Sequence, residues 1–268
     1  MLSACYRKIL QIERDNTETI LFKDVVKKYK SIIANDNLSF SVNKGEIFGL
    51  LGPNGSGKTT AIKLLTGLLY PDSGEIKILG KSPMKDWKAL RYSFGLVPQE
   101  TSLYPDLNAI QNLQFAASLY MDDLKKIKET IQHILDLVEL QNRAKDKIET
   151  YSGGMKRRLS IGRALLHNPE IILLDEPTLG VDVQGSHRIW EYIKTLAKSG
   201  KTIFVTTNVM SEADYLCSKL LIIDHGKNIA LGTPDELKES LGVKEITIKK
   251  KPSLDDVFLH YTGRSLRD

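Results

Sequence analysis

Cysteine is scarce in this sequence, and long apolar runs are missing from it. The 268 residues include two cysteines, Cys5 and Cys217, whose positions match neither a disulfide framework nor a zinc site. No stretch reaches the roughly 18–20 consecutive apolar residues that span a bilayer. Residues 1–19 carry charges and lack the apolar centre of a signal peptide. We therefore expect a cytoplasmic chain, soluble when isolated, that meets a membrane only through another polypeptide.

The charge balance excludes few partners and favours none. Hydrophobic residues make up 41% of the chain and charged residues 26%, with a net charge of +5, as in ordinary globular proteins. So small an excess is typical of a solvated surface, and no partner is inferred from it. No nucleic acid is expected among the partners. The sequence has no internal repeat, and its length suits one large domain with a smaller lobe.

The hydrophobic pattern predicts an α/β fold. Apolar residues at helical spacing run from Leu124 through Ile127, Ile131 and Leu135 to Val138. Helix and strand then alternate, with helices at 152–166 and 187–198, which predicts a largely parallel sheet covered on both faces. A further strand after Val243 and a short helix at 254–261 are expected in the tail. The predicted strands are 20–26, 38–42, 46–51, 75–79, 171–174, 202–206 and 220–224.

A complete phosphate-binding loop follows an apolar strand (47–51) and precedes a helical pattern that starts at Ala61. Its glycines let successive backbone N–H groups point at one anion, and the helix dipole adds positive potential. Lys58 would reach the β- and γ-phosphates, and the Thr59 hydroxyl would ligate Mg²⁺. A chance glycine-rich turn would not explain why the loop lies between a strand and a helix. The expected nucleotide ligands here are Gly52, Pro53, Asn54, Gly55, Ser56, Gly57, Lys58, Thr59 and Thr60.

Two carboxylates end a second apolar strand, Ile171–Leu174. In nucleotide-binding sheets the carboxyl ends of strands carry the metal chemistry. Asp175 would hold Mg²⁺, and Glu176 would polarise the water that attacks the γ-phosphorus. Many strands end in a solvated acid, so this pair gains its meaning from the phosphate-binding loop.

The run Tyr151-Ser152-Gly153-Gly154-Met155 separates one class of nucleotide-binding protein from the others. Ser152 can cap the following helix, and bare glycines leave backbone N–H groups open to an anion. A capped helix after a turn would give the same local pattern. Beside the loop and the strand-end acids, the run instead indicates a second phosphate contact.

With these motifs, residues 20–240 resemble the nucleotide-binding subunit of an ATP-binding cassette (ABC) transporter. The resemblance implies a P-loop NTPase core with a mostly parallel sheet, an N-terminal antiparallel β subdomain and an inserted α-helical subdomain at about 100–165. It leaves residues 1–19 as an arm and 241–268 as a C-terminal extension. ATP and Mg²⁺ are the implied cofactors.

The resemblance also assigns individual residues. Ser152, Gly153 and Gly154 match the signature motif, which binds ATP held by the loop of a second subunit. Tyr29 resembles the aromatic residue that stacks on adenine, and Gln99 the glutamine that contacts Mg²⁺. Asp182 resembles the acid that links two sites across the dimer.

One position departs from the family. Asn208 stands where a histidine normally contacts the γ-phosphate. An amide still donates a hydrogen bond to phosphate but cannot carry a proton as imidazole does. ATP binding should survive the change, while the rate of hydrolysis is left in question.

The leading interpretation is a motor ATPase that forms a homo- or heterodimer around two ATP molecules. It would act on separate transmembrane permease subunits, at the cytoplasmic face of the cell membrane. The amino-acid sequences of residues 150–159 and 252–264 resemble those of the ABC-2 type branch, which exports drugs, lipids or polysaccharides. The stretch after Gln99 is expected to dock the permease, with Leu103, Tyr104, Leu107 and Leu113 as candidate contacts. Alternatives are a non-transport ABC ATPase in DNA repair or on ribosomes, a subunit with impaired hydrolysis, and a P-loop small-molecule kinase.

Overall fold

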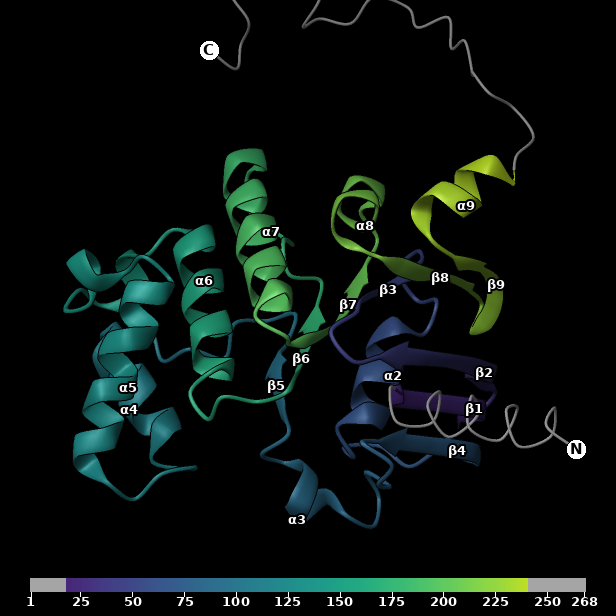
Figure 1. Ribbon diagram of the computed structural model, residues 1–268, viewed down its shortest axis with the longest axis horizontal. Coiled ribbons are helices and arrows are strands. Elements are labelled where there is room, and N and C mark those ends of the chain that lie inside the picture. Colours follow the sequence, from purple (N-terminus) through teal and green to yellow (C-terminus); the bar gives the residue numbers. More distant parts are fainter. Residues whose placement is uncertain (1–17, 241–268) are drawn as a thin grey trace, which may run out of the picture.

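Two sheets and a group of helices make up the computed structural model, which describes residues 18–240 (Figure 1). Glu18 and Thr19, assigned to the arm from the sequence, belong to the first strand. The rest of the arm, and the strand and helix expected after Val243, lie outside the described residues.

The elements alternate along the chain much as the sequence pattern predicts. The strands are β1 (Glu18–Tyr29), β2 (Ile32–Asn43), β3 (Ile47–Leu51), β4 (Ser73–Ile78), β5 (Phe94–Val97), β6 (Ile171–Asp175), β7 (Thr202–Thr207), β8 (Lys219–Asp224) and β9 (Lys227–Gly232). The helices are α2 (Lys58–Leu65), α3 (Trp87–Leu90), α4 (Ala109–Ala117), α5 (Leu124–Leu137), α6 (Gly153–Ala164), α7 (Val183–Lys198), α8 (Met210–Leu216) and α9 (Pro234–Glu239).

The larger sheet has six strands in the order β5-β6-β7-β3-β8-β9. Its first five strands are parallel, and β9 pairs antiparallel with β8. All residues of β3 and β6 are buried, as expected for strands covered on both faces. Within β3, Phe48 and Leu50 face one core while Ile47 and Leu51 face the other, which is the two-residue period of a strand.

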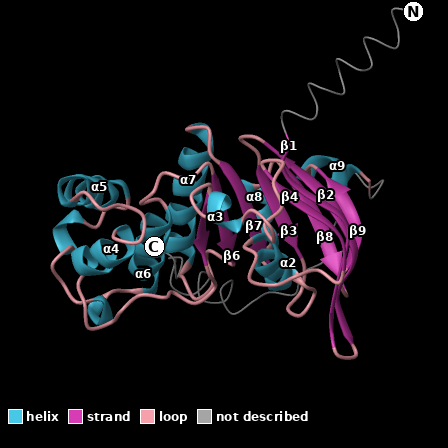
Figure 2. Cartoon of the chain, turned by 90° about the horizontal axis from the view of Figure 1, so that it is seen from below, coloured by secondary structure: helices cyan, strands magenta, loops and turns pink. Residues whose placement is uncertain are grey.

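The smaller sheet, β2-β1-β4, is antiparallel and lies against one face of the larger sheet (Figure 2). An aromatic stack joins the two sheets. The ring of Phe40 lies 4.5 Å from that of Phe22 in its own sheet, and 5.1 Å from Phe48 and 5.7 Å from Phe204 in the other. Each such pair adds about 0.5–1.5 kcal/mol beyond area burial.

Helices α4, α5 and α6 form a layer at the end of the larger sheet beyond β5 (Figure 1). Helix α5 contributes four buried side chains to the hydrophobic core of this layer, those of Ile127, Ile131, Ile134 and Leu135. Leu124 was expected on this stripe but is 74% exposed. It is the first helical residue, so the packed face begins one turn later than the pattern predicted. The predicted α/β fold, with parallel and antiparallel sheets and a separate helical layer, is confirmed.

Capping explains where the boundaries differ from the prediction. Helix α6 begins at Gly153 because Ser152 is its N-cap. Helix α7 begins at Val183, four residues before the predicted start at His187, because the Asp182 side chain accepts a hydrogen bond of 2.6 Å from the N–H of Gly185.

Strands β5 and β9 were not predicted from the sequence. Strand β5 has only four residues, and β9 is largely exposed.

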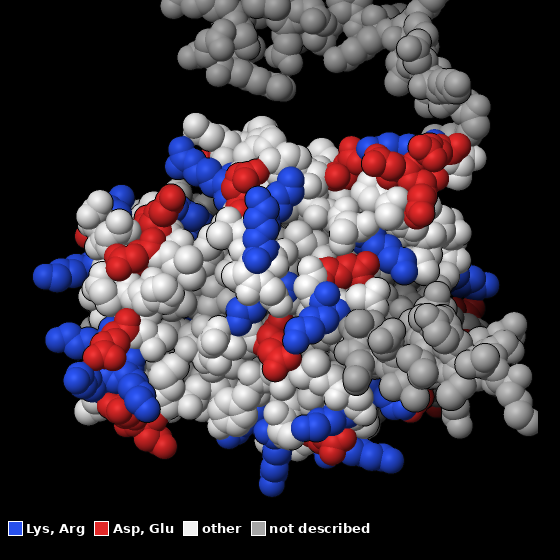
Figure 3. All heavy atoms as spheres, in the orientation of Figure 1, with Lys and Arg blue, Asp and Glu red and all other residues white. Residues whose placement is uncertain are grey.

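The surface agrees with the weak charge bias of the sequence. On the face shown in Figure 3, basic and acidic side chains of the described residues are interspersed over most of the surface, with one small group of mainly acidic side chains over α9. Among residues 18–240, no helix has both the length and the apolar character needed to cross a membrane.

Candidate active site

The phosphate-binding loop connects β3 to α2 and is held from both sides. The N–H of Gly52 donates to the carbonyl of Thr207 at 3.2 Å, and the Asn35 side chain donates to the carbonyl of Gly57 at 3.3 Å. Gly57 has φ +106°, and a Cβ there would lie 2.2 Å from the carbonyl oxygen of Ala34. Only glycine fits at this position. The loop is therefore fixed by strands β2 and β7 as well as by its own sequence.

The Lys58 side chain turns back over the loop. Its Nζ donates to the carbonyls of Gly52 at 2.9 Å and Pro53 at 3.0 Å. The same nitrogen lies 3.4 Å from Oε1 of Glu176, and the two side chains are only 4% and 8% exposed. The buried ammonium of Lys58 is thus paired with the buried carboxylate of Glu176.

The two strand-end carboxylates have different partners. Oδ1 of Asp175 accepts from the hydroxyls of Thr206 at 2.5 Å and Thr59 at 3.4 Å. Oε2 of Glu176 accepts from the amide of Gln99 at 3.1 Å. The backbone of Glu176 has φ +47°, a conformation that costs free energy and often marks functional positions. Asp175 therefore faces the Thr59 hydroxyl, and Glu176 faces Gln99 and the lysine.

Lys58, Thr59, Gln99 and Glu176 line one pocket of about 330 Å³, whereas Asp175 is not part of its lining. Tyr29, expected to stack on adenine, is the strand-register partner of Ile32 and is exposed, but it does not line this pocket, and the Lys27 ammonium lies 5.9 Å from the centroid of its ring. Ile32 and Ala34 were not found from the sequence, because it is the packing of β2 against the loop that brings them there. The lining residues are Ile32, Ala34, Asn54, Gly55, Gly57, Lys58, Thr59, Thr60, Gln99 and Glu176.

The other loop residues make contacts that hold the loop and Lys58 in place. Gly52 and Pro53 supply the carbonyls that hold the lysine. The Ser56 hydroxyl is buried and has no hydrogen-bond partner among the described residues. Asn208 directly follows β7, and its side-chain amide donates to Oδ1 of Asn54 at 3.1 Å, so the position where the family has histidine contacts the phosphate-binding loop.

The signature residues are not part of this pocket. Ser152 is exposed at the start of α6, where its hydroxyl accepts from the N–H of Met155 at 3.3 Å. A Cβ on Gly153 would lie 3.1 Å from the carbonyl oxygen of Gly180, so the motif borders the loop that carries Asp182. Ser152, Gly153, Gly154 and Asp182 are thus grouped together, apart from the lysine and the two carboxylates. The roles of all these residues stay predictions.

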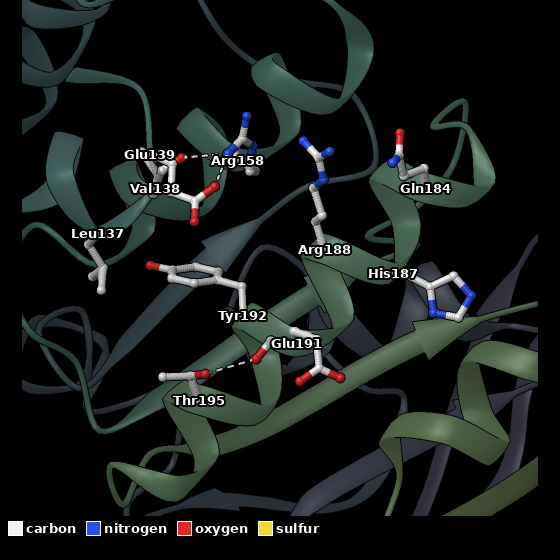
Figure 4. A pocket seen from close by; sticks show the side chains of 10 residues that line it. All are labelled: Leu137, Val138, Glu139, Arg158, Gln184, His187, Arg188, Glu191, Tyr192 and Thr195. Carbon is white, nitrogen blue, oxygen red and sulfur yellow. Dashed lines mark hydrogen bonds and ion pairs between the residues drawn. The ribbon is translucent and has the colours of Figure 1, made fainter. Parts of the chain in front are cut away.

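A second cleft, of about 570 Å³, lies along α7 where it faces α5 and α6 (Figure 4). Its lining, among the described residues, includes no member of the phosphate-binding loop. The Tyr192 hydroxyl is buried without a described partner, and burial raises the pKa of this tyrosine. Because this hydroxyl is buried, Tyr192 cannot donate a hydrogen bond to a ligand in the cleft.

Comparison with known proteins agrees with these features. Residues 35–179 match the family described as ABC transporter. The chain is 42% identical over 237 residues to the linearmycin resistance ATP-binding protein LnrL of Bacillus subtilis (strain 168), covering 88% of this chain and 76% of that protein. It is 43% identical over 219 residues to the Nod factor export ATP-binding protein I of Burkholderia thailandensis, covering 82% and 72%.

A solved structure shares the fold. The ATP-binding cassette MJ0796, a dimer in a post-hydrolysis state bound to ADP and Pi, superposes with a TM-score of 0.73 at 28% identity. The match covers 80% of this chain and 98% of that one.

Proposed function

The chain belongs to the ABC transporter family, as one of its ATP-binding subunits, and we propose that two such subunits close around ATP and hydrolyse it to drive a separate membrane permease. The observation that carries this proposal is the division of the site. Lys58, Gln99 and Glu176 meet at one pocket, while the Ser152 motif is exposed elsewhere on the same chain. A second chain would bring its own motif to the pocket.

The described residues divide the hydrolysis reaction between them. Lys58 would pair with the β- and γ-phosphates through its ammonium, and the loop N–H groups would hold the same phosphates. Glu176 would take a proton from water as the water oxygen bonds to the γ-phosphorus and the bond to the ADP oxygen breaks. Gln99, bonded to the Glu176 carboxylate at 3.1 Å, is placed to orient it.

The side-chain oxygens of Thr59, in the pocket, and of Asp175, beside it, suit Mg²⁺. The Thr59 hydroxyl and the Asp175 carboxylate are hard donors, and their oxygens lie 3.4 Å apart. Adjacent ligands of an octahedral Mg²⁺ at 2.0–2.1 Å are about 3 Å apart, so a small adjustment would let both bind, directly or through water. Gln99 would add an amide oxygen after rotating away from Glu176. Bound there, Mg²⁺ would neutralise charge on the β- and γ-phosphates.

An exposed apolar surface supports the proposed dimer. Val183 and Val209 line one cleft of about 500 Å³ beside Asp182 and Asn208. Leu179, in the loop before α7, and Met210, the first residue of α8, add further exposed apolar side chains. A second subunit placed against this surface would bury them, and apolar surface removed from water contributes roughly 25 cal/mol per Å².

A groove between the parallel sheet and the helical layer supports docking of a permease. It measures about 470 Å³ and lies between the end of α2, β5, α4 and α6. Tyr104, Phe115 and Leu119 line it and are exposed, and Arg163 contributes to a polar rim. An apolar groove with a polar rim is suited to an amphipathic helix.

The candidate contacts drawn from the sequence need one correction. Leu113 is 0% exposed, because it lies on the face of α4 that packs into the core. It cannot contact a permease, whereas the exposed Phe115 on α4 and the exposed Leu119 just after that helix can. Leu103 and Leu107 are partly buried, and Tyr104 keeps its proposed role.

The names of the two relatives support export as the direction of transport. One is a resistance protein and the other an export protein, in line with the resemblance to the ABC-2 type branch. The chain would act at the cytoplasmic face of the cell membrane, bound to its permease. A DNA-repair role of the coiled-coil type is disfavoured, since α5, with 14 residues, is the longest described helix between Lys58 and Ser152.

A direct test is hydrolysis of Mg-ATP by the purified chain. Lys58→Ala should abolish phosphate release and weaken binding of fluorescent ATP, because the phosphates lose their fixed cation. Lys63→Ala is the matched control, since Lys63 is exposed on the same helix. Wild-type hydrolysis by the Lys58→Ala protein would rule out the proposed site.

A further inference from the structure

Arg157 is a buried arginine that faces the backbone of the proposed active site. It lies in the second turn of α6 and is 2% exposed. A buried guanidinium is rare unless its N–H groups are hydrogen-bonded. Its donors reach four carbonyl oxygens: Nε to Pro177 at 2.7 Å, Nη2 to Asp175 at 2.6 Å, and Nη1 to Pro98 at 2.5 Å and Gln99 at 3.3 Å.

The four carbonyls belong to the two segments that carry the reacting groups. Asp175 and Pro177 stand on either side of Glu176, whose φ of +47° must be maintained by its surroundings. Gln99, in the other segment, donates its side-chain amide to the Glu176 carboxylate at 3.1 Å. Arg157 therefore holds the backbone of Gln99 and the backbone on both sides of Glu176.

The chemistry of the contact requires an arginine. Burial lowers the pKa of Arg157 to about 10, so the group stays charged at neutral pH and its hydrogen bonds are charge-assisted. The ammonium of a lysine has no rigid fork and cannot match carbonyls on both sides at once.

We propose that Arg157 is a positioning residue that ties the orientation of α6, and with it the Ser152 motif at the start of that helix, to the catalytic geometry of Glu176 and Gln99. This inference rests on the roles proposed above for those two residues. When a second subunit engages the Ser152 motif, a shift of α6 is transmitted through one side chain to the active site of the same chain.

The next residue provides a matched control. Arg158 points away from the site, where its Nη1 donates to the carbonyl of Val138 at 3.0 Å and to Glu139 at 3.1 Å (Figure 4). It has the same chemistry and helix but no contact with the carbonyls that Arg157 holds.

The experiment compares Arg157→Lys and Arg157→Gln with Arg158→Lys and Arg158→Gln in the full chain. We expect the Arg157 variants to bind fluorescent ATP within about two-fold of wild type while kcat falls at least roughly ten-fold. The Arg158 variants should stay within about two-fold in both. Arg157→Lys combined with Gln99→Ala should be no slower than the slower single variant, because both changes disturb one geometry.

Three results would overturn the proposed role of Arg157. An Arg157→Lys protein with wild-type kcat overturns the inference, as does a fall in ATP affinity that accounts for the whole loss. If neither Arg157 variant folds, as judged by circular dichroism and thermal melting, the residue acts on stability alone and the inference also fails. A Glu176→Gln protein that hydrolyses ATP normally would instead overturn the proposed function.

Discussion

The ammonium of Lys58 lies 3.4 Å from the carboxylate of Glu176, with both side chains more than nine-tenths buried. The same ammonium is expected to bind the ATP phosphates, so the phosphates and Glu176 compete for one cation. This pairing links the strength of nucleotide binding to the residue proposed to activate water.

We expect Glu176→Gln to bind ATP more tightly and to hydrolyse it negligibly. The amide keeps the shape of the side chain but releases the lysine, and a gain of roughly ten-fold in affinity corresponds to about 1.4 kcal/mol. Fluorescent-ATP titration and phosphate release measure the two effects. Glu170→Gln, at an exposed acid before β6, should change neither. Unchanged affinity in Glu176→Gln would mean that the ion pair does not oppose nucleotide binding.

Asn208→His should hydrolyse ATP faster than the wild type. The Asn208 amide already reaches Asn54 on the phosphate-binding loop at 3.1 Å, and charge-assisted hydrogen bonds are about twice as strong as neutral ones. A gain of about 1–2 kcal/mol in transition-state stabilisation corresponds to roughly ten-fold in kcat. Asn208→Ala should be slower than wild type.

Two other results for this position carry distinct meanings. No change in Asn208→His would show that the loop does not act on phosphate or that product release limits turnover. A wild type without hydrolysis, restored by Asn208→His, would identify a subunit that binds ATP and depends on an active partner cassette.

ATP should drive dimerisation most visibly when hydrolysis is blocked. In the Glu176→Gln background, size-exclusion chromatography with Mg-ATP should show a dimer. Ser152→Arg should prevent it at the signature motif, and Val183→Asp should prevent it at the exposed apolar surface. Ile229→Asp, at an exposed position on β9, should leave the dimer intact. A chain that stays monomeric at every ATP concentration would count against closure without the permease.

Charge in the groove should separate the subunit from its permease without affecting its own chemistry. Phe115→Asp, on α4, and Leu119→Asp, just after that helix, each place a carboxylate among the apolar side chains that line the groove. We expect lost pull-down of the cognate permease with the ATPase rate of the isolated chain within about two-fold of wild type. Leu124→Asp, at an exposed leucine on α5, is the control. Unchanged pull-down by both groove variants would place the docking surface elsewhere.

Much of the fold could be predicted because its signals are local. A buried strand such as β6 is an apolar run bounded by turns, and α6 starts where Ser152 caps it. Strands β5 and β9 were missed because four residues, or an exposed edge, leave little pattern to detect. Leu124 and Leu113 show the same limit for side chains: both fit an apolar pattern, yet one is exposed and the other is buried.

By itself, the sequence determined the chemistry available to this protein. The loop from Gly52 to Thr59, the Asp175-Glu176 pair and the Ser152 motif are contiguous, so chain connectivity alone sets which groups lie side by side. Only the tertiary structure decided which of these groups meet. Strand β3 pairs with β7 and β8, far along the chain, and β7 in turn pairs with β6, which brings Lys58 to Glu176 and Thr59 to Asp175. The carbonyl contacts of Arg157 depend on how α6 packs against two separate loops, and burial of apolar surface across the whole core, which no local pattern encodes, fixes that arrangement.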